Sequence, residues 1–126
     1  MPKILVVEDN EMNRDMLSRR LKRRGFEVIA AADGRRGISD AETWLPDLIV
    51  MDLDIPEIDG IEATRILKSS RATSEIPILV LTAHALVSDR EKAFDAGCDD
   101  FATKPVEFEQ LMVKINGLLT QKVRVS

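Results

Sequence analysis

Five short apolar runs alternate with five segments of helical pattern, and this alternation limits the fold more than any other feature. The third run, Leu48–Met51, is unbroken and bounded by acids, which is typical of a strand buried on both faces of a parallel sheet. Strands that alternate with helices favour a doubly wound α/β domain with helices on both faces. The predicted strands are Lys3–Val7, Phe26–Ala31, Asp47–Met51, Ile78–Leu81 and Asp100–Ala102.

The predicted strand order is one of the orders that occur most often in doubly wound sheets. Of the usual orders for five parallel strands, 2-1-3-4-5 places the first and third strands side by side at the switch point. Ligands of open α/β sheets bind at that point, beyond the carboxyl ends of the strands. We therefore expect the functional residues to follow the strands.

Local signals predict where the helices begin and end. Asn10 is a good N-cap for a helix from about Glu11 to Arg24, and Ser88 opens a capping box for the fourth helix. We expect the last helix to end near Thr120, which leaves residues 121–126 as a polar tail. Helical spacing predicts apolar faces formed by Met12, Met16, Leu17 and Leu21 in the first helix and by Phe108, Leu111, Ile115 and Leu118 in the last.

Composition excludes several classes of protein. The chain has 126 residues, of which 44% are hydrophobic and 32% charged, with a formal net charge of −4. We predict one domain over residues 1–126. No run approaches the ~18 apolar residues of a membrane span, and the acidic balance disfavours direct DNA binding. The single cysteine, Cys98, excludes an internal disulfide, so we expect a cytoplasmic protein.

Polar side chains follow four of the predicted strands. Glu8 and Asp9 follow the first, Asp52 the third, Thr82 the fourth and Lys104 the fifth. Three carboxylates at one sheet edge repel one another by roughly a few kcal/mol per close pair, and an all-oxygen site suits Mg²⁺. A carboxylate beside Mg²⁺ can attack phosphorus and form an acyl phosphate. The metal, Lys104 and Thr82 would then stabilise the phosphoryl oxygens.

Several short motifs of this chain are found together: Glu8-Asp9-Asn10, Asp52…Pro56…Gly60, Thr82-Ala83, Ala96–Phe101 and Lys104-Pro105. With them the chain resembles the receiver domain of bacterial two-component response regulators. This resemblance implies a flavodoxin-like (CheY-like) fold for residues 3–119 or so, with its core over the same residues. Asn10, Asn13 and the run Thr82-Ala83-His84-Ala85 are most similar to receivers of hybrid kinases and to stand-alone, DivK-like receivers.

The resemblance implies the phosphoryl chemistry. Asp52 would accept the phosphoryl group from a phosphohistidine on a sensor or hybrid histidine kinase, or on a histidine phosphotransfer protein. Asp9 and Asp52 would hold Mg²⁺, with Glu8 acting mainly through water and the carbonyl of Asp54 completing the metal shell. Lys104 would pair with the phosphoryl group. Phosphorylation and dephosphorylation would both be self-catalysed, which makes the protein a switch and not a conventional enzyme.

The resemblance also implies how the signal leaves the site. Thr82 would move toward the phosphate and Phe101 would swing inward, changing the face of the fourth helix, fifth strand and fifth helix. A downstream effector protein would bind that face, with the receiver as a monomer or weak dimer. In the family the Lys104–Pro105 peptide is usually cis. Ala83, His84 and Pro105 are expected at the site rim.

Two features leave alternatives open. Asp54 occupies a position where receivers more often carry a neutral or apolar side chain, so it either alters the lifetime of the acyl phosphate or points to solvent with little effect. The many basic residues of the first helix either complement the helix dipole as a solvated face or form a docking surface for an acidic partner.

Two other function classes compete with the phosphorylation switch. An unphosphorylated adaptor would need none of Asp9, Asp52, Thr82 and Lys104, so the presence of all four speaks against it. A small Mg²⁺-dependent phosphatase is suggested by Asp52-Leu53-Asp54, which is similar to the Asp-x-Asp motif of the haloacid dehalogenase superfamily. That family places the motif on an early strand and needs more chain after it.

Overall fold

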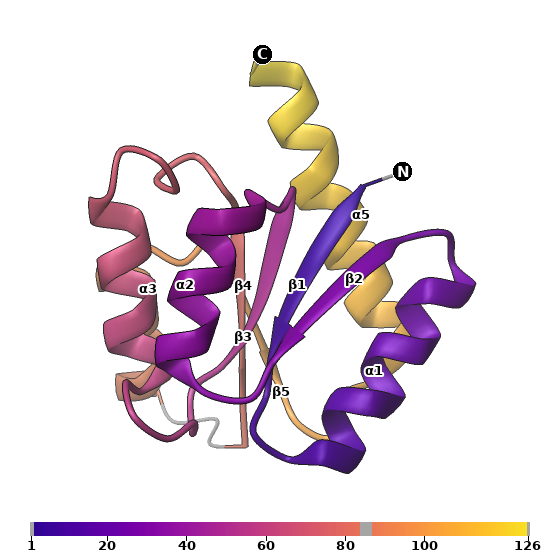
Figure 1. Cartoon of the computed structure of the whole chain (residues 1–126), viewed down its shortest axis with the longest axis horizontal. Coiled ribbons are helices and arrows are strands. Elements are labelled where there is room, and N and C mark those ends of the chain that lie inside the picture. The colour runs from indigo at the N-terminus through magenta and orange to yellow at the C-terminus, as the bar shows by residue number, and fades with distance from the viewer. Residues whose placement is uncertain (1, 84–86, 126) are drawn as a thin grey trace.

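The computed structural model of the protein describes residues 2–83 and 87–125, and for 121–125 it describes the backbone alone. Five parallel strands form one sheet in the order β2-β1-β3-β4-β5, which confirms the predicted fold class (Figure 1). The strands are β1 (Lys3–Val7), β2 (Glu27–Ala31), β3 (Leu48–Asp52), β4 (Ile78–Thr82) and β5 (Asp100–Thr103).

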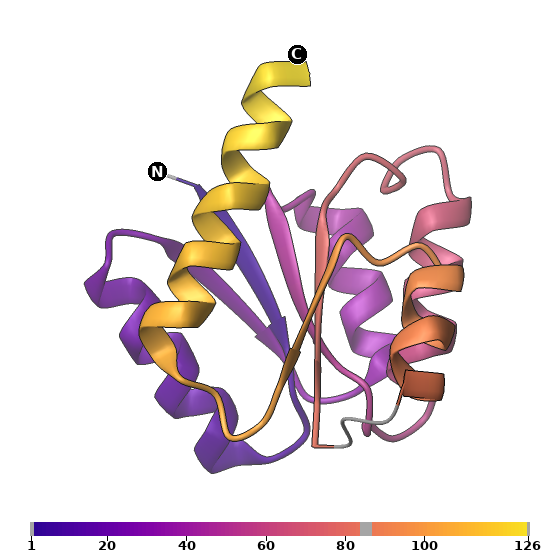
Figure 2. The ribbon, with the colours of Figure 1, turned by 180° about the vertical axis from the view of Figure 1, so that it is seen from behind.

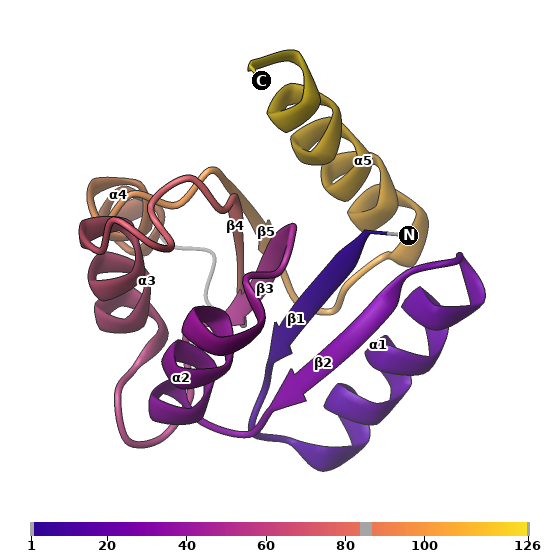
Figure 3. The same cartoon turned by 45° about the horizontal axis from the view of Figure 1, so that its top comes forward.

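Helices cover both faces of the sheet. α1 and α5 lie against one face, and α2, α3 and α4 lie against the other, as Figures 2 and 3 show from two further directions. The N- and C-termini lie at the same end of the molecule, opposite the carboxyl ends of the strands. The helices are α1 (Glu11–Arg23), α2 (Gly34–Trp44), α3 (Gly60–Ser69), α4 (Val87–Asp95) and α5 (Phe108–Val125).

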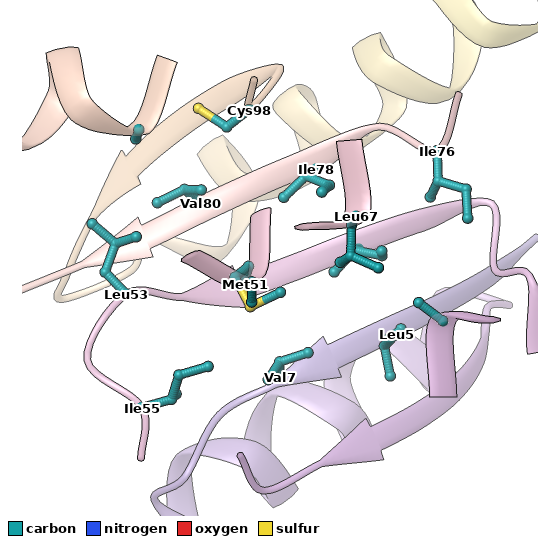
Figure 4. Close-up of a cluster of buried hydrophobic side chains, with 14 of the residues drawn as sticks. Leu5, Val7, Met51, Leu53, Ile55, Leu67, Ile76, Ile78, Val80 and Cys98 are labelled. Carbon is teal, nitrogen blue, oxygen red and sulfur yellow. The ribbon is translucent and has the colours of Figure 1, made fainter. Parts of the chain in front are cut away.

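Alternating strand residues divide the core into two layers. In β3, Ile49 and Met51 pack with α2, α3 and α4, whereas Leu48 and Val50 pack with α1 and α5. Figure 4 shows the first of these layers, in which Met51 lies between side chains of β1, α3 and β4. Because β3 is buried on both faces, its backbone is held rigidly, and so is the side chain with which it ends.

Short polar side chains begin the first three helices. Asn10, Asp33 and Asp59 each accept a hydrogen bond from the backbone N–H three residues later, as N-caps do. This confirms Asn10 as a helix start. Ser88, in contrast, lies inside α4, which begins at Val87, so the predicted capping box is wrong.

The apolar face predicted for α1 is also wrong in part. Leu21 is fully buried, but Met12 is 81% exposed and Met16 is 50% exposed. Met12 and Leu21 are nine residues apart, about two and a half helical turns, so they lie on opposite sides of the helix. In α5 the predicted face is confirmed, since Leu111, Ile115 and Leu118 are buried.

The last helix is longer than predicted. α5 continues to Val125, so residues 121–125 have helical backbone where a tail was expected after Thr120. Among the described helices, none combines the length and apolar character needed to cross a bilayer.

Candidate functional site

Three carboxylates meet at the carboxyl edge of the sheet. Glu8 and Asp9 directly follow β1, and Asp52 is the last residue of the neighbouring β3. One carboxylate oxygen from each of them lies within 4.8 Å of the other two. Glu8 and Asp52 are buried, whereas Asp9 is exposed, so the cluster is open to solvent on one side. An all-carboxylate set with room for water fits Mg²⁺, which keeps several of its waters when bound.

Lys104 lies between two of these carboxylates. It follows β5, and its Nζ donates hydrogen bonds to Glu8 Oε1 at 2.8 Å and to Asp52 Oδ2 at 3.1 Å. The peptide bond from Lys104 to Pro105 is cis, as the resemblance implied. Through its two hydrogen bonds, the Lys104 ammonium group partly neutralises the buried carboxylates of Glu8 and Asp52, which would otherwise repel each other.

The loop after β3 returns tightly against the end of the strand. Asp54 N–H donates to Asp52 Oδ1 at 3.3 Å, and Gly60 N–H donates to the carbonyl of Leu53 at 3.0 Å. A Cβ added to Gly60 would lie 2.3 Å from the carbonyl oxygen of Asp52 and 2.6 Å from Leu53 Cα. Gly60 is therefore required because only a residue without a side chain lets α3 start this close to Asp52.

Thr82 and Asp54 line the same groove, which also reaches Leu53, the residue after Asp52. Thr82 is buried at the end of β4, where Leu81 pairs with Asp52, whereas Asp54 is exposed. Ala83 and Pro105 border a second groove that also reaches Glu8 and Lys104. The roles predicted for these residues stay predictions. His84, predicted at the rim, lies outside the described residues.

Known proteins are similar to this chain in sequence and in fold. Residues 4–116 match the response regulator receiver domain family. The chain belongs to that family. It is 33% identical over 120 residues to the polar-differentiation response regulator DivK of Brucella anthropi, covering 94% of this chain and 98% of DivK.

Two further relatives show how the domain is used elsewhere. The chain is 36% identical to the DNA-binding dual master transcriptional regulator RpaA of a Synechocystis species, covering 99% of this chain but only 52% of RpaA. The receiver domain of the sensor histidine kinase PA1611 from Pseudomonas aeruginosa PAO1 superposes with a TM-score of 0.88 at 34% identity, covering 94% of this chain and 98% of that one. That crystal structure has a magnesium ion coordinated in its active-site cleft.

Receiver domains are phosphoacceptor switches that work with histidine kinases and effectors.

Burial shifts the pKa values of two charged groups at the carboxylate cluster. Removal from water raises the pKa of Glu8 from its ordinary 4.5 to about 7, and nearby Asp52 adds to the rise, which the hydrogen bond from Lys104 only partly offsets. Burial alone would lower the pKa of Lys104, but hydrogen bonds to Glu8 and Asp52 outweigh it and raise that pKa.

Phe101, predicted to be a switch residue, is buried in this structure. The ring is buried in the core layer shared with α3 and α4, and its role as a switch stays a prediction. The guanidinium carbon of Arg90 on α4 lies 5.8 Å from the ring centroid, within the range of a cation–π contact. The inward position is consistent with the pairing of Phe101 with Val80, because neighbours in register point to the same face of the sheet.

One residue near the site was missed by the sequence analysis. Arg14, in the first turns of α1, points back along its helix, and its Nη1 donates to the carbonyl oxygens of Glu8 at 3.0 Å and Asp9 at 3.4 Å. Long side chains on a helix do lean toward its N-terminus. That tendency is the only sequence signal for this contact, and it does not distinguish Arg14 from the other basic residues of α1.

Proposed function

We propose that this receiver domain is a phosphorylation switch in a phosphorelay, in which Asp52 accepts a phosphoryl group from a phosphohistidine. One observation carries the proposal: the Asp52 carboxylate lies buried at a strand end between a lysine ammonium and two further carboxylates. A purely structural aspartate has no need of this surrounding charge. The donor is a sensor or hybrid histidine kinase or a histidine phosphotransfer protein.

The residues present would hold Mg²⁺ through Asp9, Asp52 and the backbone carbonyl of Asp54, with Glu8 acting through water. When bound, the ion supplies positive charge that lets a carboxylate and a phosphoryl group approach each other. The exposed side of the cluster at Asp9 leaves space for metal-bound water. The magnesium ion in the receiver domain of PA1611 supports this choice of cation.

The transfer step exchanges one bond to phosphorus for another. A carboxylate oxygen of Asp52 bonds to phosphorus while the phosphorus–nitrogen bond of the phosphohistidine breaks, and the imidazole leaves with the electron pair of that bond. Lys104, already 3.1 Å from Asp52 Oδ2, keeps its positive charge beside the phosphoryl oxygens. Thr82 offers a hydroxyl to the same oxygens.

The new charge then changes the surface. A phosphoryl group adds about two negative charges and three acceptor oxygens, and reversing a 99:1 population requires about 5.5 kcal/mol of differential stabilisation. Contacts of the phosphoryl group with Lys104, Thr82 and the metal supply this difference. The face formed by α4, β5 and α5, which includes Phe101, then binds a downstream effector protein. Spontaneous hydrolysis of the acyl phosphate resets the switch.

Labelling with a small phosphodonor tests the proposal. With Mg²⁺ and acetyl phosphate, the wild-type protein should gain the mass of one phosphoryl group per chain, and Asp52→Asn should gain none. Beryllofluoride should bind wild type in the same stoichiometry. Sustained turnover of a phosphomonoester would instead favour the phosphatase reading, and labelling of Asp52→Asn as strong as that of wild type would refute the assignment of Asp52.

A further inference from the structure

Arg14 ties the backbone of the loop between β1 and α1 to the helix that follows it. Its Nη1 donates to two consecutive carbonyls, those of Glu8 and Asp9, whose side chains belong to the carboxylate cluster. The side chain is half-buried. The two N–H donors of Nη1 are fixed in the guanidinium plane, so they hold both carbonyls in one geometry, whereas the donors of an ammonium group rotate freely.

Other hydrogen bonds also hold the loop between β1 and α1. Glu8 N–H donates to the carbonyl of Ala31 on β2 at 3.0 Å, and Asn10 N–H donates to Glu8 Oε2 at 3.3 Å. Asn10 in turn caps α1. Asp9 differs from Glu8 because it is exposed and, among the residues that the structure describes, its carboxylate forms no ion pair, whereas that of Glu8 pairs with Lys104. The direction of its carboxylate therefore depends on how firmly its backbone is held.

We propose that Arg14 is a positioning residue for the metal site. It holds the carbonyls of Glu8 and Asp9 so that the Asp9 carboxylate stays directed toward Asp52. This inference rests on the proposed function, because it concerns the same Mg²⁺ site. Residues that orient ligands through their own hydrogen bonds change metal affinity when they are replaced.

The sign of the effect separates positioning from simple charge. A cation near a Mg²⁺ site opposes metal binding, so removing only its charge would tighten the binding of Mg²⁺. Loss of a positioning contact has the opposite effect, because the ion must then order the loop itself. Arg14→Gln and Arg14→Lys therefore form an informative pair, since the second retains the charge but loses the planar donors.

Calorimetric titration of the purified full chain with MgCl₂, without any phosphoryl donor, is the decisive experiment. We expect Mg²⁺ to bind about tenfold more weakly to Arg14→Gln and also more weakly to Arg14→Lys. Arg19→Gln is the matched control: Arg19 is on the same helix, exposed and paired with Asp15, and its replacement should leave Mg²⁺ affinity unchanged.

Three outcomes overturn the inference. Arg14→Gln that binds Mg²⁺ as tightly as wild type, or more tightly, excludes a positioning role. If both Arg14 variants unfold at a lower temperature than wild type in EDTA but bind Mg²⁺ with unchanged affinity, Arg14 stabilises the fold and does not position the metal site. Failure of wild type to bind Mg²⁺ refutes the proposed metal site as well, and so is distinguishable from the other two.

Discussion

The raised pKa of Glu8 predicts that Mg²⁺ affinity depends on pH. Mg²⁺ is attracted by ionised carboxylates, and Glu8, with a pKa of about 7 in the metal-free protein, is mostly neutral below that pH. Metal binding at about pH 6 must therefore release a proton, whereas at about pH 8 it need not. The ionised fraction changes by about tenfold between these two pH values, and we expect the apparent Mg²⁺ affinity to change by the same factor.

The same shift affects the stability of the metal-free protein. Because the pKa of Glu8 is raised from 4.5 to about 7 on folding, its neutral form stabilises the fold fully below about pH 4.5. That contribution disappears as the pH rises through about 7 and amounts to about 3 kcal/mol at most. The side chain at position 8 of Glu8→Gln stays neutral at every pH. As the pH rises from about 4.5 to above 7 in EDTA, this variant should therefore lose less folding stability than wild type.

Calorimetry at the two pH values, in buffers with different ionisation enthalpies, measures both the affinity and the proton release. Urea unfolding in EDTA at about pH 5 and about pH 8 measures the stability change. Glu8→Gln is the control for both, because its Mg²⁺ binding should be nearly independent of pH. A wild-type affinity that is equally independent of pH, without proton release, would refute the reasoning from burial.

Three further substitutions test other parts of the site. Lys104→Met should reduce beryllofluoride affinity by more than about tenfold, measured by fluorine NMR. The same variant should bind Mg²⁺ more tightly, measured by calorimetry, because the competing cation next to Glu8 and Asp52 is gone. Gly60→Ala should cost about 1–3 kcal/mol in urea unfolding, because its Cβ would press on the backbone of Asp52; unchanged stability would contradict the close packing. Asp54→Asn should change the rate of autodephosphorylation, measured by the decay of label from acetyl phosphate, and an unchanged rate assigns Asp54 to solvent.

The carboxyl edge of the sheet could be predicted from the sequence because two simple rules determine it. Alternating strands and helices impose parallel strands, and parallel strands end at the same edge. Glu8, Asp52 and Lys104 each follow a predicted strand by a residue or two, so their meeting required no knowledge of distances. Their roles in phosphoryl transfer remain predictions that the experiments above test.

Features that depend on side-chain direction could not be predicted in the same way. The contact between Arg14 and the carbonyl of Asp9 exists because one flexible side chain turns back toward its own helix start. Met12 has the helical spacing to Met16 and yet lies on the opposite side of the helix from Leu21. Each step between successive apolar residues turns the direction of the side chain around the helix axis, and these turns add up. The inward position of Phe101 follows from its register with Val80, which only the paired strands reveal.

The most direct test of the account is transfer of labelled phosphate from a phosphohistidine donor, followed by mapping of the label. We predict a single acid-stable, alkali-labile acyl phosphate on the peptide that contains Asp52, formed only with Mg²⁺ and absent from Asp52→Asn. Label on any other residue of the wild-type protein, or transfer that proceeds equally well in EDTA, would contradict the central claim that a metal-assisted aspartate is the acceptor.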